Sequence, residues 1–263
     1  MDWEKTAELK RLRELRPLVH CITNAVTIND VANILLACGA APVMATDLRE
    51  IEDFVSQSKA VLVNIGTLDK AVESAAEAAL ACAMRLGRPV VLDPVGIGAA
   101  RYRTEMVKLW LEKWPVAAIR ANASEIRALH DGTAVTQGVD AADADAVTAE
   151  TLTQRNAMAA AVAAKYHCVV SMSGAWDVIT DGSRSLVCKR GVPMMSRVTG
   201  TGCMLSALTA AFVAARPGQP FQAAYDATEF LCLCGEEAAR KTAALHGGTA
   251  SFRTFLMDAV SLA

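Results

Sequence analysis

The sequence predicts an α/β protein with a central, mostly parallel β-sheet and helices on both faces. Short apolar runs alternate with longer Ala- and Leu-rich helical segments, which is the pattern of repeated βαβ units. The chain has 263 residues, of which 53% are hydrophobic, enough for a large core. Its net charge of -2 gives no electrostatic case for nucleic acid or an anionic membrane as a partner.

Six apolar runs have the length and composition of buried strands. They span residues 19–22, 41–44, 60–64, 89–93, 117–120 and 168–172. Intervening segments such as 28–38, 70–86 and 151–165 predict helices. Two further runs, 176–180 and 185–188, flank Asp181-Gly182, a hairpin signal that predicts antiparallel strands near one edge.

The remaining segments indicate where helices and a loop lie and how many domains the chain forms. Residues from Cys203 onward are almost entirely helical in pattern, and the polar stretch 131–146 predicts a surface loop. No linker or repeat interrupts the pattern, so we expect one domain over residues 1–263. No apolar run reaches the roughly 18 residues of a membrane span, and the polar start Met1-Asp2-Trp3-Glu4-Lys5 is unlike a signal peptide.

The eight cysteines lie mostly in apolar runs, which predicts reduced thiols in a cytoplasmic protein. Cys232 and Cys234 lie in a helical run, where positions i and i+2 do not share a face, so we do not expect a metal site between them. The four histidines have no zinc-ligand spacing.

Ligands of open α/β sheets bind at the carboxyl ends of the strands. The residues expected there are polar or soft, and they are Asn24, Met44, Asn64, Asp93, Arg120 and Ser173.

The strongest local signal is the turn Thr199-Gly200-Thr201-Gly202-Cys203. Two glycines leave backbone N–H groups free to turn inward, and an Ala-rich helix follows at once, so free amides and the helix dipole both favour phosphate. The alternative is a tight turn for close packing. The motif is not a Walker A loop, because no Gly-Lys-Ser/Thr follows.

Cys203 lies in the first turn of that helix, where the dipole stabilises a thiolate that can accept a proton from a substrate hydroxyl. A cysteine nucleophile is the alternative chemistry, and it needs a partner histidine. The sequence places none of the four histidines beside Cys203. A third alternative is a buried thiol without a chemical role.

Asp93 ends a buried strand before a Pro/Gly turn, where it could hold hydrated Mg²⁺ beside phosphates or cap the turn. The following Gly96-Ile97-Gly98 half-matches a dinucleotide fingerprint, but Arg101 replaces the third glycine and no acidic residue follows at the usual distance. We therefore reject NAD binding.

Arg120 has a guanidinium fork that suits phosphate. Glu125 falls in the first turn of a helix, a placement that the helix dipole alone explains. Asn24 could hydrogen-bond a small polar ligand and Met44 could give a soft apolar contact, although either residue taken alone is more often structural.

Taken together, these motifs resemble the hydroxyethylthiazole kinase family of the ribokinase-like superfamily. The resemblance covers nearly the whole chain, and six motifs occur in the order of the family. They are Ile22-Thr23-Asn24, Pro42-Val43-Met44-Ala45, Leu62-Val63-Asn64-Ile65-Gly66-Thr67-Leu68, Leu92-Asp93-Pro94-Val95-Gly96, Arg120-Ala121-Asn122-Ala123-Ser124-Glu125-Ile126 and Val198-Thr199-Gly200-Thr201-Gly202-Cys203.

The resemblance implies a ribokinase-like three-layer sandwich that phosphorylates 4-methyl-5-(2-hydroxyethyl)thiazole with ATP and Mg²⁺, in thiamine salvage. It also implies a homotrimer with sites between neighbouring subunits. In this family pattern Met44 and Gly200 contact the thiazole, and Asn24 lies nearby.

The same resemblance gives roles to the remaining motif residues. Arg120 and Ser173 would contact ATP, and Asp93 and Glu125 would organise Mg²⁺. The amides of Gly200, Thr201 and Gly202 would form the anion hole. Cys203 stands where related sugar kinases carry an aspartate as base.

Two residues depart from the family pattern: Ser173 stands where Thr is usual, and Ala121 stands where Gly is frequent. Two rival functions stay open. A nicotinamide-hydrate dehydratase of the same superfamily tends to have Asp in place of Cys203. A non-catalytic binder of thiazole or a thiamine precursor would not need Arg120, Asp93 and Glu125 together with the glycine turn.

Overall fold

A computed structural model describes residues 7–132 and 149–263. Its strands form one eight-stranded sheet in the order β2-β1-β3-β4-β5-β6-β7-β8. The strands are β1 (Leu18–Ile22), β2 (Ala41–Val43), β3 (Ala60–Asn64), β4 (Val90–Asp93), β5 (Ala118–Asn122), β6 (Val169–Ser173), β7 (Asp177–Thr180) and β8 (Ser185–Cys188).

The sheet is parallel from β2 to β6, and β7 and β8 are antiparallel additions at one edge. This confirms the predicted hairpin at Asp181-Gly182 and the mostly parallel centre. Apolar runs such as that of β3, which is buried along its whole length, need helices on both faces.

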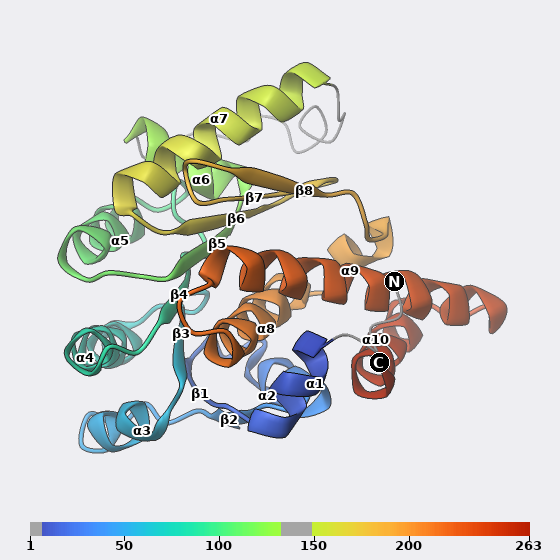
Figure 1. Ribbon diagram of the computed structural model, residues 1–263, viewed down its shortest axis with the longest axis horizontal. Helices are drawn as coiled ribbons and strands as arrows, with labels where there is room; N and C mark the ends of the chain where they lie inside the picture. Colours follow the sequence, from blue (N-terminus) through green and yellow to red (C-terminus); the bar gives the residue numbers. More distant parts are fainter. Residues whose placement is uncertain (1–6, 133–148) are drawn as a thin grey trace.

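Helices cover both faces of the sheet and make a three-layer sandwich (Figure 1). The side chains of α3 to α7 pack on one face, and those of α1, α2 and α8 to α10 pack on the other. The helices are α1 (Ala7–Leu15), α2 (Ile28–Cys38), α3 (Ile51–Gln57), α4 (Lys70–Leu86), α5 (Arg101–Lys113), α6 (Ala123–Asp131), α7 (Ala149–Tyr166), α8 (Thr201–Ala215), α9 (Pro220–Ala244) and α10 (Thr249–Leu262), and the short 3₁₀ helix η2 (Pro193–Arg197) precedes α8.

Local chemistry explains several helix ends. Asp69 caps α4 by accepting a hydrogen bond from the N–H of Val72, and Gly87 ends the helix in the left-handed conformation at φ 61°. Asn122 and Glu125 form a reciprocal capping box at the start of α6, which ties the end of β5 to the helix that follows it.

The structure corrects one predicted boundary. Arg120 was expected at a strand end, but β5 continues to Asn122, which pairs with Ser173 of β6, so Arg120 lies in the middle of the strand. Of the predicted loop 131–146, residues 133–146 lie outside the described residues, and Asp131 is the last residue of α6. None of the helices in the described ranges combines the length and apolarity needed to cross a bilayer.

Candidate active site

The parallel strands bring the predicted residues to one edge of the sheet. Asn64, Asp93 and Ser173 are the last residues of β3, β4 and β6. Asn24 follows β1 and Met44 follows β2. Because neighbouring parallel strands end at the same side, these side chains line up in the order of the sheet.

Helix α8 begins above this edge and packs against β1, β3 and β4. Its N-cap residue, Gly200, has φ 89°, a left-handed conformation that other residues rarely adopt. Gly200 has no side chain with which to cap the helix, so within residues 7–132 and 149–263 no N-cap hydrogen bond occupies the N–H groups of its first turn. Thr201 turns its hydroxyl away to the carbonyls of Met195 and Val198, at 2.9 and 2.8 Å, and contributes its backbone to the turn.

The Cys203 sulfur, half-buried in the first turn of α8, is held by two amides. Asn24 Nδ2 and Asn64 Nδ2 each lie 3.3 Å from Sγ. The amide orientations are fixed, since Asn24 Oδ1 accepts from the N–H groups of Val26 and Thr27, and Asn64 Oδ1 accepts from the N–H of Gly66. The NH₂ groups must therefore face the sulfur, which acts as the acceptor in both contacts.

Asp93 is buried next to this pair. Its Oδ2 accepts hydrogen bonds from Asn64 Nδ2 at 2.8 Å and Ser206 Oγ at 2.6 Å, and it lies 4.0 Å from Arg120 Nη1. Burial raises the pKa of Asp93 above its ordinary value, although Arg120, Ser206 and Asn64 each counteract this. Its Oδ1 is buried and has no hydrogen-bond partner among the described residues, so this oxygen is available to a cation or a water bound to one.

Glu125 lies near enough to Asp93 for the two charges to interact. Burial, and secondarily the charge of Asp93, raises the pKa of Glu125. Its two oxygens accept from the N–H of Gly96 at 3.0 Å and of Asn122 at 2.8 Å. Glu125 therefore joins the loop after β4 to the start of α6, the capping role that the sequence allowed. Its role toward a metal ion stays a prediction.

Arg120 bridges the two sides of the site. Its Nη2 donates to Ser173 Oγ at 2.9 Å, while Nη1 faces Asp93. A Cβ on Gly202 would lie 2.4 Å from Arg120 Nη1, so glycine is required for α8 to approach the guanidinium this closely. The uncapped turn and a fixed guanidinium together form a cradle suited to phosphate oxygens.

The structure connects Asn24, Asp93, Arg120, Ser173 and Cys203 in one network of contacts. Met44 is partly buried and packs against the hydrophobic core to which α8 contributes, and its contact with the thiazole stays a prediction. The segment after β2 is held in place because buried His20 hydrogen-bonds through Nε2 to the carbonyl of Ala45, at 2.7 Å.

Sequence reasoning gave no site role to Asn64, Ser206 or Arg103. Asn64 was recognised as a strand-end residue, but its bridge between Cys203 and Asp93 was not foreseen. Ser206 lies three residues after Cys203, on the same side of a helix, and that spacing could have indicated it. Arg103 donates from Nη1 to the carbonyls of Ile65 and Val95, both at 2.8 Å, and so ties together the loops after β3 and β4.

A model of the hydroxyethylthiazole kinase family matches residues 9–263 of the chain. The chain belongs to the hydroxyethylthiazole kinase family. A hydroxyethylthiazole kinase from Clostridium acetobutylicum is 41% identical over 253 residues, covering 96% of this chain and 92% of that protein.

Solved structures agree with the family assignment. The structure of a hydroxyethylthiazole kinase protein from Pyrococcus horikoshii OT3 matches with a TM-score of 0.84 and 36% identity, covering 97% of this chain and 92% of that one. A ribokinase-like superfamily protein from Enterococcus faecalis matches with a TM-score of 0.61 at 13% identity, covering 98% and 91%. This second match concerns the fold alone, which is the ribokinase-like fold that the resemblance implied.

Proposed function

We propose that this member of the hydroxyethylthiazole kinase family transfers the γ-phosphate of ATP to the hydroxyl of 4-methyl-5-(2-hydroxyethyl)thiazole. The observation that carries the proposal is the juxtaposition of Cys203 with the uncapped first turn of α8 and with Arg120. A proton acceptor and a phosphate cradle then lie at the same helix start. A non-catalytic binder would need neither a buried Asp93 nor an Arg120 fixed by Ser173.

In the proposed reaction, the substrate oxygen forms a bond to the γ-phosphorus while the bond from that phosphorus to the β–γ bridging oxygen breaks, and ADP leaves. Cys203 Sγ, as the thiolate, accepts the hydroxyl proton late in the transfer. The amides of Gly200, Thr201 and Gly202 and the Arg120 guanidinium stabilise the charge that develops on the phosphoryl oxygens. Asn24 and Asn64 hold the sulfur in position through the two 3.3 Å contacts. Met44 and Gly200 would contact the thiazole.

Asp93 and Glu125 would hold Mg²⁺, which neutralises phosphate charge when bound. The unpartnered Oδ1 of Asp93 supports this, because a buried carboxylate oxygen without a donor is stabilised by a cation. Two buried carboxylates with raised pKa values, close enough for their charges to interact, also favour a positive ion between or beside them.

A coupled ADP-release assay with ATP and Mg²⁺ tests the function. The acceptors are hydroxyethylthiazole, hydroxymethylpyrimidine and pyridoxal, and a reaction without acceptor measures background ATP hydrolysis. We expect ADP release with the thiazole alcohol, at least about tenfold above the other acceptors, since a tenfold preference requires only about 1.4 kcal/mol, which a few lost substrate contacts supply. A chain that releases no ADP with any of the three alcohols would not be this kinase. ADP release with another alcohol alone would retain a kinase and overturn the substrate.

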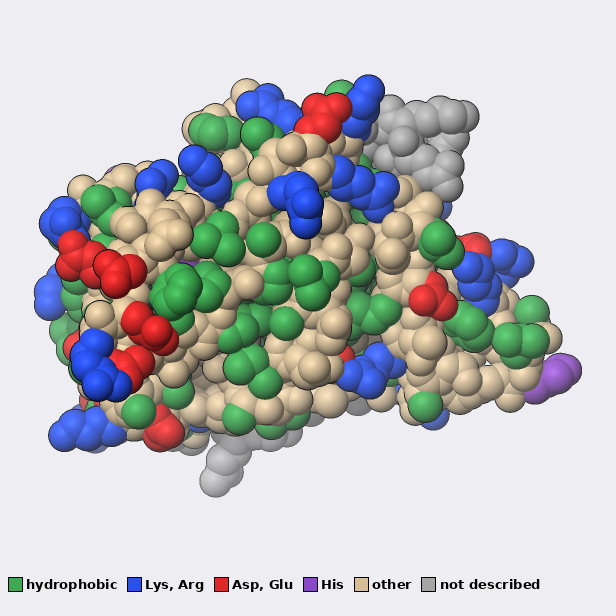
Figure 2. Space-filling model, turned by 90° about the horizontal axis from the view of Figure 1, so that it is seen from below, with side chains coloured by type: hydrophobic (Ala, Val, Ile, Leu, Met, Phe, Trp, Pro, Cys, Tyr) green, Lys and Arg blue, Asp and Glu red, His purple; other side chains and the backbone are tan. Residues whose placement is uncertain are grey.

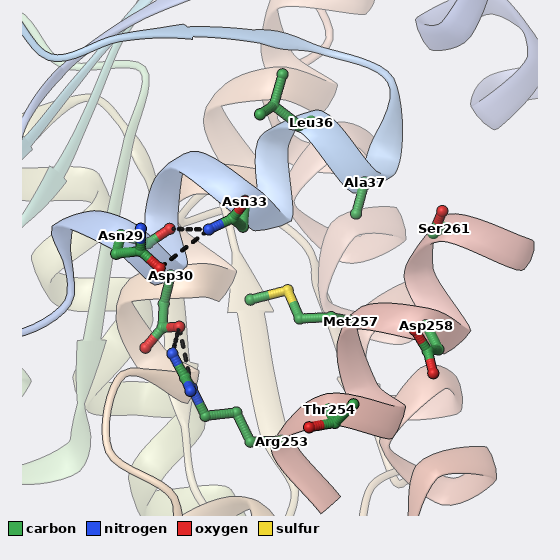
Figure 3. A pocket seen from close by; sticks show the side chains of 10 residues that line it. All are labelled: Asn29, Asp30, Asn33, Leu36, Ala37, Arg253, Thr254, Met257, Asp258 and Ser261. Carbon is green, nitrogen blue, oxygen red and sulfur yellow. Dashed lines mark hydrogen bonds and ion pairs between the residues drawn. The ribbon is translucent and has the colours of Figure 1, made fainter.

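The proposal includes a homotrimer with the thiazole site between subunits. A groove between α2 and α10, lined by residues such as Asp30, Asn33, Leu36, Arg253 and Met257, supports it (Figure 3). Asp30 pairs with Arg253 inside this groove, and a Cβ on Gly200 would lie 3.5 Å from Asp30 Oδ2. The groove is thus next to the turn that would contact the substrate.

Exposed apolar side chains also support the proposed homotrimer. Val26, Ile28 and Leu36 are exposed on α2 or just before it, and Leu48 is exposed in the segment between β2 and α3. Figure 2 shows hydrophobic side chains gathered on the face seen from the β2 side of the sheet. Light scattering after size exclusion tests the state: we expect three times the mass of one chain, and Leu36→Glu should lower it. A monomeric wild-type protein with full activity would overturn the trimer and leave the kinase intact.

The proposal also treats residues 1–263 as one kinase domain that acts in the cytoplasm. Its support is that all strands of the described ranges join one sheet, and that all eight cysteines are free thiols.

A further inference from the structure

A second group of thiols and carboxylate lies apart from the Cys203 site. Asp177 of β7, Cys188 of β8 and Cys232 of α9 are all buried, and one potential ligand atom of each lies within 4.8 Å of the others. Among residues 7–132 and 149–263 it is the one such group of three or more metal-ligating side chains. The kinase mechanism uses none of the three.

The geometry of the group fits a tetrahedral metal ion. Cys232 Sγ lies 3.6 Å from Asp177 Oδ2. Zinc bonds of about 2.3 Å to sulfur and 2.0 Å to oxygen, at a tetrahedral angle, place those two ligand atoms about 3.5 Å apart. The other oxygen of the carboxylate is anchored, since Asp177 Oδ1 accepts from the N–H of Gly174 at 2.9 Å, so Oδ2 is directed at the thiols.

The side of the group that faces Gly191 is where a fourth ligand would bind. Gly191 has φ 105°, and a Cβ built on it would lie 3.3 Å from Cys232 Sγ and 3.5 Å from Met195 Sδ. Glycine therefore lets the backbone approach both sulfur atoms closely. A water molecule or the Met195 thioether can complete four-coordination there, and both sulfur ligand types suit a thiophilic cation.

We propose that Asp177, Cys188 and Cys232 form a binding site for a thiophilic divalent cation of the Zn²⁺ class. Such an ion joins the antiparallel edge of the sheet to α9. It also fixes the segment that runs from Cys188 through η2 into the catalytic turn, where the Met195 carbonyl holds the hydroxyl of Thr201 at 2.9 Å. The site is a brace for the phosphate-binding turn and takes no part in the chemical step.

A redox disulfide between Cys188 and Cys232 is the competing explanation of the paired thiols. It leaves the buried Asp177 carboxylate without a role. Both thiols are also buried away from an oxidant.

The test uses the full chain, expressed in medium supplemented with Zn²⁺ so that the buried site is loaded during folding, with any affinity tag removed. We expect one zinc per chain by elemental analysis after gel filtration, and a melting temperature several degrees lower after chelation at elevated temperature. Protein produced with Co²⁺ should show the intense near-ultraviolet thiolate-to-cobalt absorption of a two-thiolate site.

Variants assign the ion to this group of residues. Cys232→Ala and Asp177→Asn should each lower the zinc content to less than about a tenth, because loss of one ligand costs orders of magnitude in affinity. Cys234→Ala is the matched control, since Cys234 is a buried thiol two residues further along the same helix and outside the group. Cys203→Ser, which removes the active-site thiol, should retain the ion.

Two results would overturn the proposal. One is wild-type protein that contains no stoichiometric metal and whose melting temperature is unchanged by chelation. The other is zinc that is lost from Cys203→Ser and kept in Asp177→Asn, which would place the ion at the kinase site. Should Cys232→Ala fail to fold, the wild-type measurements and the conservative Asp177→Asn variant still decide the question.

Discussion

Two regions of the molecule each place a cysteine near a buried carboxylate where the sheet meets a helix. In the first, Cys203 of α8 is half-buried, and Asn64 stands between its sulfur and Asp93. In the second, Cys232 of α9 is buried and contacts Asp177 directly at 3.6 Å. The Cys203 sulfur accepts hydrogen bonds from two amide NH₂ groups. The Cys232 thiol instead donates a hydrogen bond to the Asp177 carboxylate and lies close to Cys188.

The difference shows how surroundings decide what a thiol can do. Two N–H donors and partial exposure leave the Cys203 sulfur as a hydrogen-bond acceptor at the surface of the site. Burial against a carboxylate does the opposite for Cys232, whose pKa is raised by its contact with Cys188, by burial and by Asp177. The first environment suits proton transfer, and the second suits either a neutral thiol or a metal-bound thiolate.

Removal of the active-site thiol is expected to give the largest effect. Cys203→Ala should lower kcat by about 10²–10⁴-fold, the usual contribution of a general base, and leave measurable activity from positioning and charge stabilisation. Steady-state kinetics at saturating ATP and thiazole alcohol measure it. The matched change Cys234→Ala should leave kcat unchanged. A Cys203→Ala enzyme with wild-type kcat would remove Cys203 from the base role.

The same substitution in both regions should have opposite outcomes. Cys203→Asp should keep activity, because a carboxylate can accept the two amide N–H groups and the substrate proton. Cys232→Asp would bury a second carboxylate against Asp177 and should cost about 3 kcal/mol or more of unfolding free energy. Urea denaturation in the presence of EDTA, with kinetics on both variants, compares them. A folded but inactive Cys203→Asp protein would contradict the proposed geometry of the base.

Alanine substitutions at two glycines should distinguish an effect on ATP binding from an effect on the stability of the fold. In Gly202→Ala the new Cβ would lie 2.4 Å from Arg120 Nη1, so the guanidinium must move and KM for ATP should rise about 10–100-fold, as for a lost hydrogen bond to a charged group. Gly191→Ala, at φ 105° beside Cys232, should instead lower stability by about 1 kcal/mol and raise KM for ATP far less than Gly202→Ala, because it acts on the turn only through the segment before α8. If the two variants raised KM for ATP equally, the group of Asp177, Cys188 and Cys232 would belong to the ATP site.

The smallest expected effect is that of Ser206→Ala on the protonation of Asp93. Ser206 Oγ donates to Asp93 Oδ2, so Ser206→Ala removes a stabiliser of the carboxylate and raises its pKa further. If the charged form is required, the acid limb of the kcat/KM profile moves to higher pH, and kcat/KM on that limb falls about tenfold. Thr209→Val is the control, because the Thr209 hydroxyl bonds a backbone carbonyl on the same helix. An acid limb that stays in place would show that Asp93 does not control it.

The sequence was sufficient to predict the parallel sheet, its antiparallel edge and the helix that starts after the glycine turn. These features are local: apolar runs, a hairpin dipeptide and two glycines each carry their own signal. The end of β5 could not be predicted, because that strand continues to Asn122 only through its pairing with Ser173.

Contacts between elements that are far apart in the chain could not be predicted from the sequence. Asn24, Asn64 and Cys203 are separated by many residues, and their shared hydrogen bonds exist only because β1 and β3 are neighbours beneath α8. From the sequence we did not expect a metal site between Cys232 and Cys234, which are neighbours along one helix. The sequence had no means of placing Cys232 beside Asp177 and Cys188, which come from the edge strands.

The fixed amides around Cys203 have a consequence for the path of the proton. Asn64 joins Cys203 to Asp93 by two N–H groups of one NH₂, at 3.3 and 2.8 Å, and an amide does not exchange a proton between its neighbours on the timescale of turnover. The Asn64 side chain therefore does not pass protons between the Cys203 sulfur and the Asp93 carboxyl group. In the proposed reaction, a proton taken up by Cys203 would have to leave by the exposed side of the sulfur, and solvent would reset the base between catalytic cycles without passing the proton to Asp93.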